Sequence, residues 1–111
     1  MYGDENLNFA IDCVIQRFEF TFELMWKTLK DYLEITGYNE FDVGPRGILK
    51  FAFKNGIIDN EENFSLMLND RNSTTHMYDE KMAKSIYLNV KNKYVKEFEN
   101  VIKYLDKNYK I

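Results

Sequence analysis

The sequence predicts an all-α fold, an antiparallel up-and-down bundle of four helices, three of them substantial. Apolar residues recur at steps of three and four through long segments, which is the helical period. Only one proline and five glycines interrupt the 111 residues, whereas many short strands would need more turn residues. No stretch alternates apolar and polar residues as a half-buried strand does. The length fits one domain, residues 1–111, with one core.

The first helix is expected from about Asn8 to Thr36, and Gly37 follows as its C-terminal stop. Besides its main apolar face it carries a second apolar set, so it needs cover on two sides, from its own domain and from a partner. The main face comprises Ile11, Ile15, Phe18, Phe22, Met25, Leu29 and Tyr32, and the second set comprises Cys13, Phe20, Leu24 and Trp26.

Two shorter helices are expected next. Pro45 suits the first turn of a helix over Arg46–Asn55, and Gly56 closes it. Asp59 or Asn60 then caps a third helix, which should end in a run of residues that leave helices easily. Its core face would consist of Phe64, Met67, Leu68 and the stem of Arg71.

The last helix should be the second long one. Asp79 is a good N-cap, and the helical period continues to about Lys107. The residues expected to face the core are Met82, Ile86, Val90, Tyr94, Phe98, Val101, Ile102 and Leu105.

The single histidine, His76, lies five residues after Arg71, and this pair is the most informative feature for function. Arginine offers a permanent fork of donors to phosphate, and histidine can move a proton near neutral pH. On an unbroken helix, five residues rotate through roughly 500°, which separates the two side chains by about 140°. They can converge only if the third helix ends between them, within the Asn-Ser-Thr-Thr run of residues 72–75.

Composition limits the partners. The net charge of −3 and the pI of about 5.2 argue against a broad basic surface for duplex nucleic acid, but not against a small cleft for one or two phosphates. No apolar run approaches the ~18 residues that a membrane span needs, and no signal peptide is recognisable. Cys13, the only cysteine, fits a reducing cytoplasm and is expected to be buried.

The sequence lacks the residue patterns that metal sites and nucleotide-transferring enzymes require. The histidine has no glutamate three residues before it, so neither a dinuclear metal site nor another metal or cofactor is expected. A glycine-rich phosphate loop is also missing, so the chain should not transfer nucleotides itself. We interpret Glu19, Glu23, Lys27 and Asp31, spaced four apart, as a solvated helical face.

Three blocks carry a resemblance to a known family. The segments Val14–Leu33, Pro45–Ile58 and Met67–Glu80 are similar, in order and spacing, to blocks of the nucleotidyltransferase substrate-binding proteins. These proteins belong to the HEPN superfamily and are encoded beside a minimal nucleotidyltransferase. The resemblance extends over roughly residues 10 to 105.

The resemblance implies a HEPN-like bundle of the four-helix type that pairs into homodimers, with the motif in a cleft near the dimer axis. Members of the family usually begin with a further full helix, whereas only about ten residues precede the first block here. We therefore expect another subunit to complete the bundle.

The resemblance also implies a function. In this superfamily, arginine followed at this spacing by histidine marks metal-independent endoribonucleases. In the paired toxin–antitoxin systems, a tyrosine two residues later receives AMP from the nucleotidyltransferase, which silences the toxin. Carried over to this chain, Arg71 and His76 would be catalytic, Tyr78 the acceptor, and Asp70 and Asn72 supporting residues. RNA would be the substrate, and cleavage would leave a 2′,3′-cyclic phosphate.

Other interpretations stay open at this point. Arg71 and His76 could simply stabilise a helix end, and Tyr78 could be a core or interface aromatic. The chain could also be a non-catalytic subunit that presents substrate to a separate nucleotidyltransferase, or a scaffold without a ligand.

Overall fold

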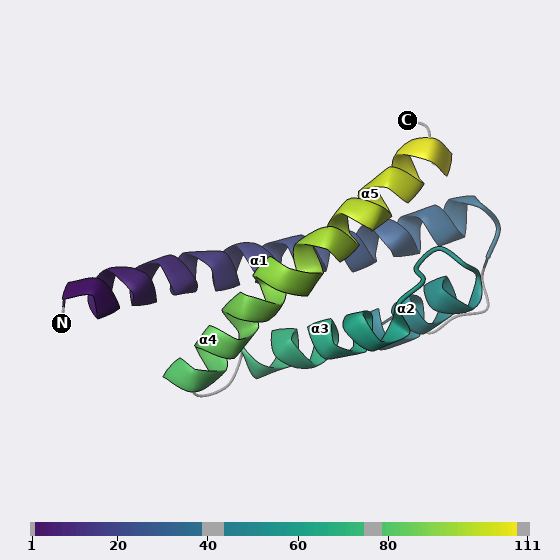
Figure 1. The fold of residues 1–111 in the computed structure, drawn as a ribbon. Coiled ribbons are helices and arrows are strands. Elements are labelled where there is room, and N and C mark those ends of the chain that lie inside the picture. Colours follow the sequence, from purple (N-terminus) through teal and green to yellow (C-terminus); the bar gives the residue numbers. More distant parts are fainter. Residues whose placement is uncertain (1, 39–43, 75–78, 109–111) are drawn as a thin grey trace.

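The computed structural model describes residues 2–38, 44–74 and 79–108, and the regular structure of these three stretches is entirely helical. This confirms the all-α prediction. The last helical segment, residues 80–108, is continuous but changes from α-helical to π-helical winding in the middle (Figure 1). The elements are α1 (Tyr2–Ile35), α2 (Pro45–Lys54), α3 (Glu61–Ser73), α4 (Glu80–Asn89), the π-helical turn η1 (Val90–Tyr94) and α5 (Val95–Asn108).

The molecule is elongated because α1 runs along its whole length. At about 1.5 Å per residue, the 34 residues of α1 span about 51 Å, close to the longest extent of 54 Å. Figure 1 shows α3 running back beside the second half of α1, and the α4–η1–α5 rod crossing α1 in the same general direction as α1 itself. The succession is therefore up, down and up, as expected for a HEPN-like bundle.

The helix ends follow the signals in the sequence. Gly37 has a φ of 98°, a left-handed conformation that suits glycine, and α1 ends just before it. The side chain of Asn60 accepts a hydrogen bond from the Asn63 N–H at 3.0 Å and so caps α3. Asp79 caps α4 by accepting from the Lys81 N–H at 2.8 Å. Asn60, rather than Asp59, is the cap.

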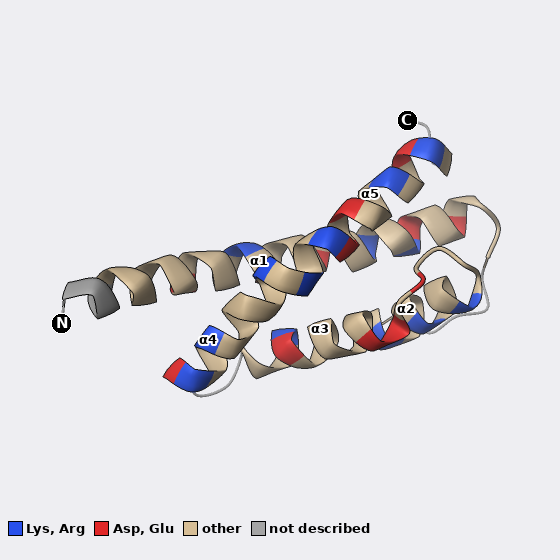
Figure 2. Ribbon diagram, viewed as in Figure 1, with Lys and Arg blue, Asp and Glu red and all other residues tan. Residues whose placement is uncertain are grey.

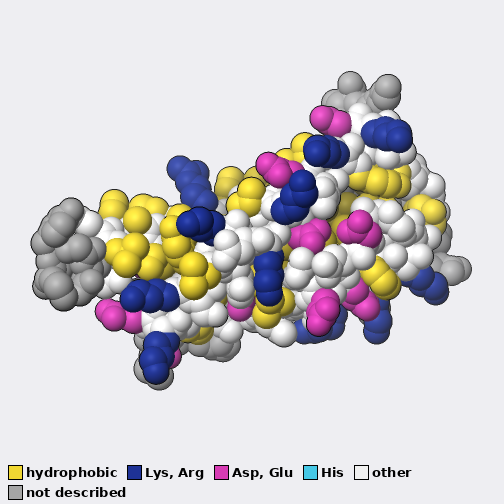
Figure 3. Space-filling view, viewed as in Figure 1, with side chains coloured by type: hydrophobic (Ala, Val, Ile, Leu, Met, Phe, Trp, Pro, Cys, Tyr) yellow, Lys and Arg dark blue, Asp and Glu magenta, His cyan; other side chains and the backbone are white. Residues whose placement is uncertain are grey.

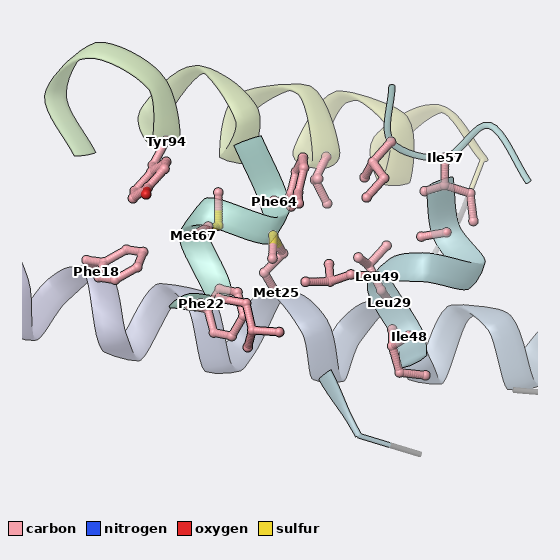
Figure 4. Packing of buried hydrophobic residues seen from close by; sticks show 14 of the residues in the cluster. Phe18, Phe22, Met25, Leu29, Ile48, Leu49, Ile57, Phe64, Met67 and Tyr94 are labelled. Atoms are coloured by element: carbon pink, nitrogen blue, oxygen red, sulfur yellow. The ribbon is translucent and has the colours of Figure 1, made fainter. Parts of the chain in front are cut away.

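The core lies where α1, α2, α3 and the last helix meet (Figure 4). The main apolar face predicted for α1 is buried along its length, except that Ile15 is only partly buried. From the other elements, the core takes Ile48, Leu49, Ala52, Phe64, Met67, Leu68, Ile86, Val90, Tyr94 and Val101, among others.

Two expectations about burial are wrong. Cys13 is exposed, because it lies on the side of α1 opposite the main face. Ile102 is 59% exposed, since it lies on a flank of α5 that the described helices leave uncovered. The second apolar set of α1 is real, however: Phe20 and Leu24 are 60% and 52% exposed.

The π turn η1 was not anticipated. The N–H of Val95 donates to the carbonyl of Val90, five residues earlier, so one extra residue is wound into the helix. On an α-helix, the side chains of residues five apart, such as Asn89 and Tyr94, would diverge by about 140°. The π turn reduces this angle, so these two side chains lie closer to the same side of the helix. This change of winding bears directly on the site.

Candidate functional site

The candidate site starts at the C-terminal end of α3. Arg71 lies in the last turn, the helix ends at Ser73, and the C-cap Thr74 N–H donates to the Asp70 carbonyl at 3.2 Å. The prediction that the helix ends between Arg71 and His76 is therefore confirmed. His76 and the proposed acceptor Tyr78 lie outside the described residues.

Arg71 is held on both sides of its guanidinium. Its Nη2 donates to the carboxylate of Glu23 from α1 in a short ion pair, and its Nη1 donates to Asn72 Oδ1 at 3.2 Å. The guanidinium carbon lies 5.8 Å from the centre of the Phe22 ring, which adds a cation–π contact. The side chain remains 28% exposed. Arg71 is therefore oriented yet accessible to an anion.

Two acidic residues that the sequence placed on a solvated face belong to this site. Glu23 pairs with Arg71 and also accepts from the Trp26 indole at 3.2 Å, and Glu19 accepts from the Thr74 hydroxyl at 2.6 Å. The solvated-face interpretation is thus wrong for these two glutamates. A signal existed: each glutamate directly follows a core phenylalanine and therefore lies at the edge of the buried face.

Asp70 faces the opposite way from Arg71, toward the last helix. Its Oδ2 accepts a short hydrogen bond from the Tyr94 hydroxyl and a second one from Asn89 Nδ2 at 3.0 Å. Asn89 directly precedes η1 and Tyr94 is its last residue, so the π turn allows both donors to reach one oxygen. Burial and the bond to Asp70 raise the pKa of Tyr94 far above its ordinary value. Asp70 therefore ties the end of α3 to η1.

The site also has a hollow beside it. A pocket of about 210 Å³ lies between α1 and α4 at the C-cap of α3, and Thr74 forms part of its wall. A larger one, of about 330 Å³, lies between α2 and the body of α3. Only the smaller pocket adjoins the segment that leads to His76.

The described ranges contain neither a cluster of metal-ligating side chains nor a helix fit to span a membrane. Over residues 2–38, 44–74 and 79–108, no three His, Cys, Asp or Glu side chains gather to hold a metal ion. In the same stretches, no helix combines the length and apolarity that a membrane span requires.

The all-helical fold, with α3 antiparallel to α1 and Arg71 in the last turn of α3, is compatible with a HEPN-like helical bundle. The model of the family described as "Nucleotidyltransferase substrate binding protein like" matches residues 2–107, nearly the whole chain. The chain belongs to this family.

One relative extends the comparison. A Haemophilus influenzae protein named "Probable ribonuclease HepT" is 34% identical over 79 residues. The match covers 68% of this chain and 54% of the relative, so the chain spans about half the relative's length. The relative's name concerns that protein alone.

Proposed function

We propose that this protein is the toxin component of a two-gene system, an endoribonuclease that cuts RNA without a metal. The observation that carries the proposal is Arg71, held by Glu23 and Phe22 at a helix end and still open to an anion. Such a preorganised cation stabilises the charge that builds on a phosphate during cleavage. Family membership and the name of the relative support the same reading.

The proposed reaction needs one cation and two proton-transfer groups. His76 takes the proton from a ribose 2′-OH, whose oxygen attacks the adjacent phosphorus while Arg71 neutralises the phosphorane. The bond from phosphorus to the 5′ oxygen breaks, and that oxygen receives a proton from the partner subunit's His76. The products are a 2′,3′-cyclic phosphate and a free 5′-hydroxyl.

This mechanism calls for a homodimer, and one face of α1 is suited to an interface. Phe9, Cys13, Phe20 and Leu24 lie along one side of α1, opposite the main buried face, and all are exposed. Phe9, in the N-terminal third of α1, is 72% exposed. A second copy of this chain would cover such an apolar stripe.

Cleavage should be tested on purified dimer with RNA in EDTA. We expect cleavage that leaves a 2′,3′-cyclic phosphate and is abolished in His76→Ala. Asn100→Ala, at an exposed residue of α5, is the control and should cleave like the wild type. Cleavage that persists in His76→Ala would overturn the ribonuclease proposal.

We further propose that a separate minimal nucleotidyltransferase silences the protein by transferring AMP from ATP to the Tyr78 hydroxyl, which loses its proton while pyrophosphate leaves. Incubation with that enzyme, ATP and Mg²⁺ should increase the intact mass by one adenylate and stop RNA cleavage. Tyr78→Phe should gain no mass, whereas Tyr87→Phe, on α4, should still be modified. A mass gain that survives in Tyr78→Phe would remove Tyr78 as the acceptor.

The alternative function is a non-catalytic subunit that presents substrate to the nucleotidyltransferase. The family's description favours it, because that description speaks of substrate binding and not of catalysis. In this case RNA would stay intact, and the activity of the nucleotidyltransferase would rise when this protein is added. For either function we propose a cytoplasmic location, which suits a chain with one exposed thiol.

A further inference from the structure

The positive charge of this acidic protein is concentrated on one helix. Between Lys81 and Lys96 the sequence has five lysines and no acidic residue. The other 95 residues contain 10 of the 15 basic and all 18 acidic residues, a net charge of −8. All five lysines are exposed, and in the described part of the chain the ion pairs involve only Glu23, with Lys27 and with Arg71. None of the five lysines is paired with a carboxylate within the described ranges, and Glu80 and Glu97 flank the run in the sequence.

Four of these lysines, Lys81, Lys84, Lys91 and Lys96, form a line along the rod α4–η1–α5, whereas Lys93, two residues after Lys91, lies on the opposite side. Lys84 and Lys91 are seven residues apart, close to two full turns, and the π turn brings Lys96 toward the same side. Figure 2 shows Lys and Arg recurring along this rod, and Figure 3 shows Lys and Arg side chains exposed on the same face of the molecule, among acidic and apolar ones. From Lys81 to Lys96 the line is about 22 Å long. A linear array of this kind matches a linear polyanion better than it matches a compact acidic patch.

A hollow lies on the α1 side of the same rod, and its one cationic lining residue is Arg17 of α1. It has a volume of about 270 Å³, lies between α1 and the η1–α5 segment, and is lined mainly by apolar and aromatic side chains such as Phe98. Arg17 and Cys13, both exposed, lie on its α1 side. Lys91 belongs to η1, whose Val90 lines the opposite wall. An apolar hollow beside cationic side chains is the arrangement that single-stranded nucleic acid uses, with bases in the hollow and phosphates on the cations.

We propose that the lysine line and this hollow bind the RNA strand, with phosphates along Lys81 to Lys96 and bases against Phe98 under Arg17. This inference rests on the proposed function, because RNA is the substrate there. Lys81 lies five residues after His76, at the start of α4, so the line leads away from the segment that holds the motif.

Binding should be measured with a 2′-O-methyl RNA of about twelve nucleotides, which cannot be cut through its 2′ oxygen. Lys84→Gln/Lys91→Gln should bind about tenfold more weakly, and its dependence of log affinity on log salt should be about 1.4 smaller in slope. Lys50→Gln/Lys54→Gln, on α2, removes the same charge elsewhere and should behave like the wild type.

Equal losses of affinity in the two lysine pairs would overturn the proposal. Loss of nucleotidyltransferase binding alone in Lys84→Gln/Lys91→Gln would assign the surface to a protein partner instead.

These outcomes are independent of catalysis. If the wild type binds RNA through the lysines but never cuts it, the binding surface stands and the ribonuclease proposal fails. If the wild type cuts RNA and the lysine variants bind and cut equally well, the ribonuclease proposal stands and the surface is wrong.

Discussion

Asp70 and Arg71 are neighbours on the last turn of α3, yet the fold holds them in different ways. Asp70 points to η1 and is held by two uncharged donors, Tyr94 and Asn89. Arg71 points to α1 and is held by a charged partner, Glu23, at a position where about a quarter of its side chain stays in contact with solvent. Asp70 therefore fastens the end of the helix, whereas Arg71 is presented from it.

At this helix end, Asp70 contributes to stability and Arg71 is available for chemistry. A hydrogen bond to a largely buried phenol is worth the most where water is absent, and salt affects it little. An ion pair at a partly open position contributes less and is screened by salt. Substitutions at the Asp70 side should therefore change folding, and those at Arg71 should change activity.

The largest effect is expected for Arg71→Ala on RNA cleavage. Loss of a preorganised cation at a phosphorane should lower the rate by about 100- to 1,000-fold, while the free energy of unfolding changes by about 1 kcal/mol or less. The measurement is single-turnover cleavage alongside urea unfolding. Arg46→Ala, at an exposed arginine of α2, should leave both unchanged. Full cleavage by Arg71→Ala would show that Arg71 only closes the helix end.

Asp70→Ala should have the next largest effect, this time on stability. It removes the common acceptor of Tyr94 and Asn89 and leaves the buried phenol unpaired, at a cost of about 2 kcal/mol. Urea unfolding would measure this loss, and Asp31→Ala, at an exposed carboxylate of α1, should stay within about 0.5 kcal/mol of the wild type. Equal stability of the two variants would mean that Asp70 does not fasten α3.

Much of this helix end could be predicted from the sequence. The break after Arg71 followed from the Asn-Ser-Thr-Thr run, because those side chains compete for the backbone, and the caps at Asn60 and Asp79 followed from the same chemistry. These are local effects, and local sequence reveals them.

The partners across the bundle could not be predicted in the same way. Glu23 reaches Arg71 over 48 positions of sequence and Tyr94 reaches Asp70 over 24, and no local pattern encodes which helix packs against which. The π turn was also hidden, because one extra residue in a helix leaves the heptad pattern on either side intact.

The difference in stability between the wild type and Tyr94→Phe should depend on pH, and this dependence tests the hydrogen bond between Tyr94 and Asp70. The variant keeps the ring stacked on Phe18, whose centre is 5.3 Å away, and loses one hydrogen bond, about 1 kcal/mol at neutral pH. Because the folded pKa of Tyr94 is raised above 10, its contribution is complete below pH 10 and is lost as the pH rises further. Above pH 10 the unfolded chain gives up the proton and the native protein keeps it.

The advantage of the wild type over Tyr94→Phe should therefore be constant from pH 7 to about 9.5 and shrink above pH 10 by up to about 1.4 kcal/mol per pH unit. Urea midpoints across this range would measure it. Tyr104, whose pKa the bond to Tyr32 and burial raise to about 12, is present in both proteins and cancels in the difference. A difference in stability between the two proteins that stays constant up to pH 11 would contradict the prediction.

Glu23→Gln should have the smallest effect on stability. It should also distinguish most clearly between the Glu23–Arg71 ion pair and the Tyr94–Asp70 hydrogen bond. The amide keeps an acceptor for Arg71 but removes the charge, so the loss of stability at low salt should be about 0.5 kcal/mol. At 1 M salt the Debye length falls to about 3 Å, and most of that difference should vanish, whereas the cost of Tyr94→Phe should persist. Urea unfolding of both variants at low and high salt makes the comparison directly. If the loss of stability caused by Glu23→Gln were as insensitive to salt as that caused by Tyr94→Phe, the ion pair between Glu23 and Arg71 would be a buried structural contact. Arg71 would then not be the residue that is accessible to an anion.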